Sequence, residues 1–169
     1  MASSDVHARH VHDGLFDEDD QGNAYLRGGR CGTCGRLQFP LASTCPACGG
    51  DQIEEVRLAD HGTLWGWTAV TAPPPGYLGD VPFGFGVVEL ADGLRVITRI
   101  EEPDPSKLEF GMPMRLALVE LDGPGSDAAA AAGPVTTYTF LPTPSAALEG
   151  SATHDVAESS NRAEGGSST

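Results

Sequence analysis

The sequence predicts a mostly β protein built from two small modules, a metal-binding ribbon followed by a five-stranded barrel. Two Cys-x-x-Cys pairs lie close together at 31–34 and 45–48. Five segments with strand character and glycine bends follow between residues 63 and 142. No stretch has the periodicity of a helix long enough for a strand–helix–strand crossover, which argues against a parallel α/β fold.

The cysteines carry the clearest chemical signal: Cys31, Cys34, Cys45 and Cys48 are all the cysteines of the chain. A tight turn with this spacing directs two sulfurs at one ion, and the glycine after each pair permits a positive φ. Two such turns predict a closed four-thiolate site with one structural Zn²⁺. The alternatives are iron with the same ligands, redox use of the motif, and two disulfides.

Short strands are expected around these turns, in a ribbon module over residues 24–58. Residues 24–27 lead into the first pair, 37–41 alternate between apolar and polar positions, and 53–58 leave the ribbon. We expect Phe39 to cover the metal site. So small a module has little core of its own, and metal binding must supply much of its folding free energy.

A barrel module is expected over residues 59–142. Gly66 predicts a bulge, and Asp92-Gly93 predicts a hairpin turn. Five strands with one longer connection fit a small barrel of the OB type, and an unclosed β-sandwich is the alternative. The expected strands cover residues 63–71, 82–90, 94–100, 114–121 and 135–142.

The remaining segments read as connections and tails. Residues 1–23 are acidic and contain His7, His10 and His12, which predicts a flexible segment. The proline-rich loop 72–80 is expected to be stiff and to present Tyr77 to a partner or ligand. Residues 123–133 predict a flexible insertion, and the small, polar residues 143–169 predict a disordered C-terminal tail.

Charge limits the classes of partner. The formal net charge is −14 and Lys107 is the only lysine, which argues against nucleic-acid binding because that affinity depends on Lys and Arg. No apolar run is long enough to span a membrane, and no signal or lipidation motif is present. Together with reduced, metal-bound cysteines, this predicts a cytoplasmic protein without membrane contacts.

We expect no catalytic residues in this chain. All four cysteines are committed to metal, and His61, the one histidine outside the terminal segments, adjoins Gly62 in a predicted turn or hinge. Arginines on one strand face could meet phosphate oxygens, and aromatic side chains could line a groove or interface; core packing and ordinary solvated arginines are the alternatives. The candidate binding residues are Trp65, Trp67, Tyr77, Phe83, Phe85, Arg95 and Arg99.

An ordered series of motifs resembles the DUF35 family over roughly residues 24–142. It comprises Cys-x-x-Cys-Gly, Phe39-Pro40, Cys-Pro-x-Cys-Gly, Gly62-Thr63-Leu64-Trp65-x-Trp67-Thr68 and the terminal Tyr138-x-Phe140-x-Pro142. The resemblance implies a rubredoxin-like zinc ribbon followed by an OB fold. Many members begin with two helices, whereas the segment before Cys31 is short, acidic and turn-like here.

The resemblance also implies a role. Members are accessory subunits of thiolase-superfamily enzymes, including thiolases, hydroxymethylglutaryl-CoA synthases and the aldolases of steroid side-chain breakdown. This chain would then be a required, non-catalytic subunit of a hetero-oligomer that binds acyl-CoA and cleaves or forms C–C bonds, as in steroid side-chain or aromatic acyl-CoA degradation. The alternatives are a nucleic-acid-binding zinc-ribbon/OB module and a rubredoxin-like electron carrier.

Overall fold

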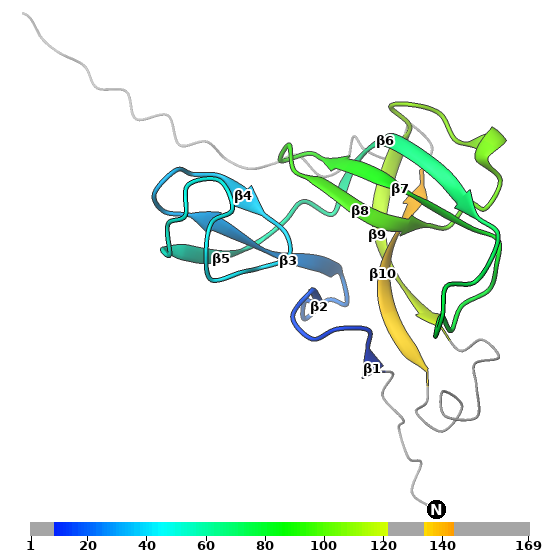
Figure 1. Ribbon diagram of the computed structural model, residues 1–169, viewed down its shortest axis with the longest axis horizontal. Coiled ribbons are helices and arrows are strands. Elements are labelled where there is room, and N and C mark those ends of the chain that lie inside the picture. The colour runs from blue at the N-terminus through cyan, green and yellow to red at the C-terminus, as the bar shows by residue number, and fades with distance from the viewer. Residues whose placement is uncertain (1–8, 122–133, 144–169) are drawn as a thin grey trace, which may run out of the picture.

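The computed structural model describes residues 9–121 and 134–143. The predictions for His7, for the insertion 123–133 and for the tail beyond residue 143 lie outside the described residues. The described residues form ten strands and one short 3-10 helix. Figure 1 shows a barrel of β6 to β10 with a ribbon of β3 to β5 projecting from its side.

The barrel is closed, as the OB prediction requires and unlike an open sandwich. The sheet order is β10-β8-β7-β6-β9, and β9 pairs again with β10 to complete the circle. The pairing of β10 with β8 is parallel, and the other pairings of the barrel are antiparallel. The strands are β6 (His61–Val70), β7 (Phe83–Leu90), β8 (Arg95–Ile100), β9 (Pro113–Leu121) and β10 (Val135–Pro142), with η1 (Pro105–Lys107) between β8 and β9.

Glycines let the barrel close. The register of β6 against β7 shifts between Leu64 and Gly66, which confirms the predicted bulge. On β7, a Cβ at Gly84 would lie 2.4 Å from the Glu102 carbonyl oxygen, and one at Gly86 would lie 2.4 Å from the Gly66 carbonyl oxygen. The close approach at these two glycines is therefore made by the barrel's own backbone.

The ribbon is organised around β3 (Ala24–Cys31), which pairs with both β4 (Leu37–Gln38) and β5 (Ile53–Arg57). Strand β3 is longer than expected and reaches the first metal-site cysteine. Strand β4 is shorter than the expected 37–41, because Pro40 has no N–H with which to continue the ladder.

The N-terminal segment differs from the flexible segment expected over 1–23. Strand β1 (Arg9–His10) pairs in parallel with β10, and β2 (Phe16–Glu18) pairs with the start of β3. Phe16 anchors this segment, since it is only 1% exposed and its ring lies 4.5 Å from that of His10. The segment is held by one buried aromatic residue, which leaves no periodic pattern in the sequence from which its strands could be predicted.

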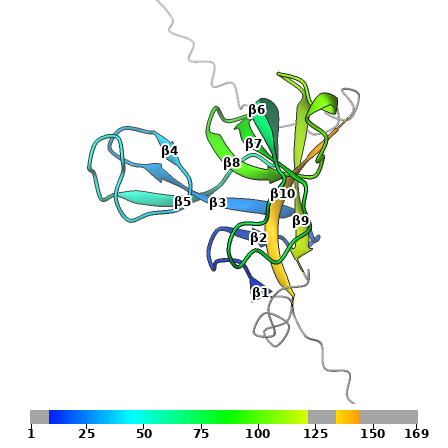
Figure 2. The same cartoon turned by 45° about the vertical axis from the view of Figure 1, so that its right-hand side comes forward.

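One hydrophobic core joins the ribbon to the barrel. Phe16, Leu26 and Leu58, which belong to the ribbon side, pack in the same cluster as the barrel interior. The Phe39 ring meets that of Tyr138 on β10 edge to face, with 5.6 Å between ring centroids, so Phe39 lies at the junction of ribbon and barrel. A cover over the metal site by Phe39 stays a prediction. Figure 2 shows β3 running from the side of the barrel into the ribbon.

In the described part of the chain, no helix is both long and apolar enough to cross a membrane.

Candidate metal centre and binding surface

The four cysteines converge within the ribbon, where their sulfur atoms all lie within 4.8 Å of one another. The Sγ atoms of Cys31 and Cys48 are 3.6 Å apart, and those of Cys34 and Cys45 are 3.7 Å apart. Sulfurs bound at about 2.3 Å to one tetrahedral ion are separated by about 3.8 Å, so the spacing fits a four-thiolate metal site. All four are free thiols, which makes the disulfide alternative wrong.

The turns around the site have the predicted geometry. Gly35 and Gly49 have φ angles of 72° and 74°. Their N–H groups donate to the carbonyl oxygens of Cys31 and Cys45 at 2.8 and 2.9 Å. Each glycine thus closes the turn that presents two sulfurs to the same point.

The pKa values of the thiols in the metal-free site indicate how metal binding would change their protonation. Backbone N–H groups of Cys34 and Thr33 lower the pKa of Cys31 to about 6. At Cys48 the Gly50 N–H favours the thiolate, but the neighbouring sulfurs of Cys34 and Cys31 outweigh it and raise the pKa to about 12. Without a cation Cys48 therefore keeps its proton at neutral pH, and a bound divalent metal displaces it.

His61 occupies a structural position between two strands. Its Nδ1 lies 2.9 Å from Asp60 Oδ1, and Arg115 Nη2 lies 3.6 Å from the other oxygen of Asp60. His61 pairs with Arg115 in the register of β6 and β9. These contacts tie the ribbon–barrel connection to β9. His61 and Gly62 are the first residues of strand β6, so the predicted turn is wrong, and a hinge role stays a prediction.

Part of the predicted binding set lies on the outside of the barrel, on a surface that we call the outer face, formed by Trp65, Phe85, Arg95 and Ile97. The side chains of Trp65, Phe85 and Ile97 are 44%, 40% and 62% exposed. The Arg95 guanidinium lies over the Trp65 ring and pairs with Glu89, with 2.7 Å between Nε and Oε2. Ile97 is missing from the predicted set, although its alternation with Arg95 and Arg99 places it on this face.

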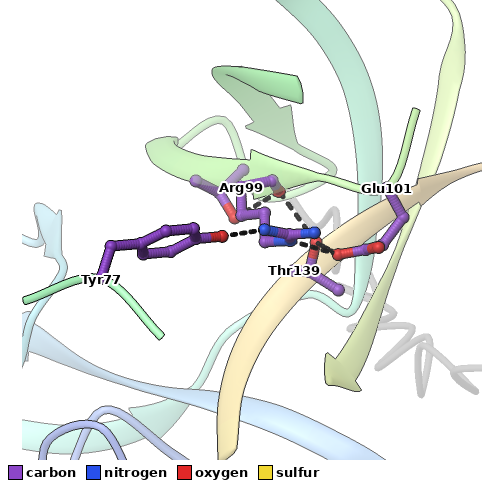
Figure 3. Close-up of polar contacts among 5 residues, drawn as sticks. Tyr77, Arg99, Glu101 and Thr139 are labelled. Atoms are coloured by element: carbon purple, nitrogen blue, oxygen red, sulfur yellow. Dashed lines mark hydrogen bonds and ion pairs between the residues drawn. The ribbon is translucent and has the colours of Figure 1, made fainter. Parts of the chain in front are cut away.

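A second group clamps the proline-rich loop onto the barrel (Figure 3). Arg99 donates to the Tyr77 hydroxyl and, from Nε, to Glu101 Oε1 at 2.5 Å. Thr139 Oγ1 lies 3.2 Å from the same Glu101 oxygen. The Tyr77 ring packs on Phe83 with 4.8 Å between centroids, and burial raises the pKa of Tyr77. Arg99 is thus held within the protein by Tyr77 and Glu101.

Trp67 belongs to neither group. It packs against the hydrophobic core, and its Nε1 donates to the Pro105 carbonyl oxygen at 3.1 Å. The bulge before Gly66 separates it from Trp65, because the extra residue sends the two side chains to opposite sides of the sheet.

Both modules match known domain families. Residues 24–54 match the ChsH2 rubredoxin-like zinc ribbon domain, and residues 55–119 match the ChsH2 C-terminal OB-fold domain. The chain is 35% identical over 91 residues to the benzoylsuccinyl-CoA thiolase subunit BbsA of Thauera aromatica, covering 53% of this chain and 62% of that subunit. It is 33% identical over 91 residues to a DUF35 domain-containing scaffold protein of Pyrococcus furiosus, covering 54% of this chain and 66% of that protein.

The match therefore spans less than two thirds of the length of either relative. Among solved structures, the chain is similar to one described as an Ltp2-ChsH2(DUF35) aldolase, with a TM-score of 0.53 and 29% identity, covering 70% of this chain and 84% of that chain. The two domain matches together extend over residues 24–119, more than half of the chain, in the order that the structure shows. This chain belongs to the DUF35 family of zinc-ribbon and OB-fold proteins.

Proposed function

We propose that this chain is a non-catalytic subunit that docks on a thiolase-superfamily partner and helps bind acyl-CoA in a complex that cleaves or forms C–C bonds. The observation that carries the proposal is its similarity, over 70% of its length, to a chain of the structure described as an Ltp2-ChsH2(DUF35) aldolase. Similarity to a benzoylsuccinyl-CoA thiolase subunit supports the same class of partner. The reaction would be that of a thiolase or an aldolase.

We assign structural Zn²⁺ to the four cysteines. The sulfur spacing and the match to a zinc ribbon domain support this choice. Four thiolates fill the coordination shell of the ion, so the metal fastens the ribbon and leaves no open position for substrate. Thiolates that must stay reduced to bind metal favour the cytoplasm as the compartment.

The outer face is the proposed docking surface for the partner. Exposed Trp65, Phe85 and Ile97 lie together there, and aromatic residues are enriched at the centres of protein interfaces. The charge of Arg95 is balanced by Glu89, so little unpaired charge has to be desolvated on docking. Acyl-CoA would contact this chain at the edge of the same face, where Arg95 is the candidate for a phosphate group.

No specific observation favours the nucleic-acid alternative. The net charge of −14 opposes binding of a polyanion.

Co-expression with candidate thiolase-superfamily proteins of the same organism tests the proposal. We expect the two chains to co-purify as a hetero-oligomer of fixed stoichiometry that contains zinc and binds CoA esters. If the chain purifies alone from every such pairing and no CoA ester binds, the proposal is wrong. A colourless site with one zinc ion per chain would set aside the electron-carrier alternative, since an iron–thiolate site is coloured.

A further inference from the structure

A groove of about 440 Å³ lies at the junction of the ribbon and the barrel. One wall comes from the ribbon, where Arg30, Arg36 and Leu37 lie beside the first cysteine turn. The other wall is the β7–β8 hairpin, which contributes Asp92 and Leu94. The groove shares no residue with the outer face.

Neither of its two arginines has an ion-pair partner among residues 9–121 and 134–143, where Arg9 and Arg57 are the other basic residues without one. Glu54 lies opposite Arg30 in the register of β3 and β5 but forms no ion pair with it, and no hydrogen bond joins Arg30 or Arg36 to a cysteine sulfur in the described part. Most other basic residues are paired: Arg27–Glu55, Arg95–Glu89, Arg99–Glu101, Lys107–Glu102 and Arg115–Asp60.

The two arginines come from neighbouring positions of paired strands. Arg30 lies on β3 opposite Leu37, and Arg36 precedes Leu37. The Cys31 N–H donates to the Arg36 carbonyl oxygen at 3.0 Å, which holds the two backbone segments together. Both arginine residues are exposed, so their guanidinium groups are available to an anion.

The one acidic side chain of the groove has a structural task. Asp92 Oδ2 accepts a hydrogen bond from the Ala59 N–H at 3.0 Å, and this fixes the hairpin against the connection between the modules. Two arginines and one aspartate leave the groove with one net positive charge. That charge matches a single carboxylate better than a phosphate dianion, which would also meet the Asp92 charge.

Apolar surface adjoins the charge. Leu37 and Leu94 are half-buried, and both pack against the hydrophobic core. We propose that this groove binds an acidic peptide segment of a protein partner, with a carboxylate between Arg30 and Arg36 and the adjoining apolar side chain on Leu37 and Leu94. The identification of that partner as the thiolase-like subunit rests on the proposed function, whereas the binding of an acidic peptide does not.

The test is an NMR titration of the zinc-loaded full chain with two synthetic peptides, acetyl-Gly-Glu-Leu-Gly-amide and its glutamine analogue. We expect the glutamate peptide to shift the Nε–H signals of Arg30 and Arg36, and the glutamine peptide to bind about tenfold more weakly. Binding should also weaken as salt is added. The double variant Arg30→Gln with Arg36→Gln should lower the affinity for the glutamate peptide about tenfold or more.

The matched control is Arg9→Gln with Arg57→Gln, which removes the same charge outside the groove and should bind the peptide as the wild type does. Equal binding of the two peptides, or shifts confined to residues outside the groove, would overturn the proposal. Tighter binding of inorganic phosphate than of the glutamate peptide would overturn the carboxylate assignment. These titrations use this chain alone, so a failure to pair with a thiolase-like protein leaves their outcome unchanged.

Discussion

The guanidinium carbon of Arg95 lies 4.2 Å from the centroid of the Trp65 ring, so a strand arginine covers one face of an exposed tryptophan. Glu89 holds the same guanidinium from the neighbouring strand. A contact of this kind at an exposed site stabilises by about 0.5–1 kcal/mol. The contact therefore holds the Trp65 side chain in one orientation before a partner binds. This reduces the side-chain conformational entropy that is lost on docking.

The first prediction concerns the outer face. Trp65→Ala combined with Phe85→Ala should weaken binding of the thiolase-like partner at least about tenfold, as expected for aromatic side chains at the centre of an interface. Both side chains are well exposed, so the free energy of unfolding should fall by little more than the contribution of the Trp65–Arg95 contact, about 0.5–1 kcal/mol. Isothermal titration calorimetry and thermal melting measure the two quantities. Phe110→Ala is the control, because Phe110 is 71% exposed but lies in the β8–β9 connection; an equal loss of binding in this control would contradict the assignment.

The second prediction concerns the clamp on the proline-rich loop. Tyr77→Phe removes the hydroxyl that accepts from Arg99 but keeps the ring that packs on Phe83. We expect a loss of about 1 kcal/mol and faster amide exchange in the loop. Tyr25→Phe is the control, since the Tyr25 ring lies under Arg57 and its hydroxyl has no partner in the described part of the chain. Unchanged exchange at residues 76–79 in Tyr77→Phe would show that the hydroxyl does not hold the loop.

The third prediction separates two glycines of the barrel. A Cβ at Gly86 would lie 2.4 Å from the Gly66 carbonyl oxygen, whereas a Cβ at Gly66 has no atom within 4 Å. Gly86→Ala should therefore destabilise the barrel by about 1–3 kcal/mol, and Gly66→Ala should change stability by less than about 0.5 kcal/mol. Urea unfolding of both variants measures the difference. Equal free energies of unfolding for the two variants would mean that Gly86 and the Gly66 carbonyl oxygen are not in such close contact.

The fourth prediction concerns the pH dependence of metal binding. In the metal-free chain the pKa of Cys48 is about 12, so its proton must leave when Zn²⁺ binds at pH 7. The metal-bound site holds fewer protons than the free site, so zinc affinity should fall as the pH is lowered. The fall should steepen below about pH 6, where Cys31 is also protonated in the free chain. Calorimetry in two buffers of different ionisation enthalpy counts the protons released. No proton release, or an affinity independent of pH between 6 and 8, would contradict the four-thiolate site.

The parts of this molecule that sequence could predict depend on residues close together in the chain. The spacing of Cys31 and Cys34, the bulge at Gly66 and the alternation of Arg95 with Val96 are local patterns, and the structure has all three. The resemblance to the family added the expected role and the class of partner.

What the sequence could not predict depends on how distant segments meet. The contact of Phe39 with Tyr138 and the groove between Arg36 and Asp92 exist only because the ribbon packs against the barrel. Strand β1 has two residues and hence no period to detect. Trp65 and Trp67 are two residues apart and would share a face of a regular strand, but the bulge between them sends their side chains to opposite sides of the sheet.

The most direct measurement of the central proposal is the rate of acyl-CoA cleavage by the thiolase-like protein, with and without this chain. We expect the partner alone to be inactive or nearly so, this chain alone to be inactive, and the mixture to be active up to the stoichiometry of the complex. Addition of the outer-face double variant should restore little of that activity. Full activity of the partner alone, unchanged when this chain is added, would contradict a role as a required subunit.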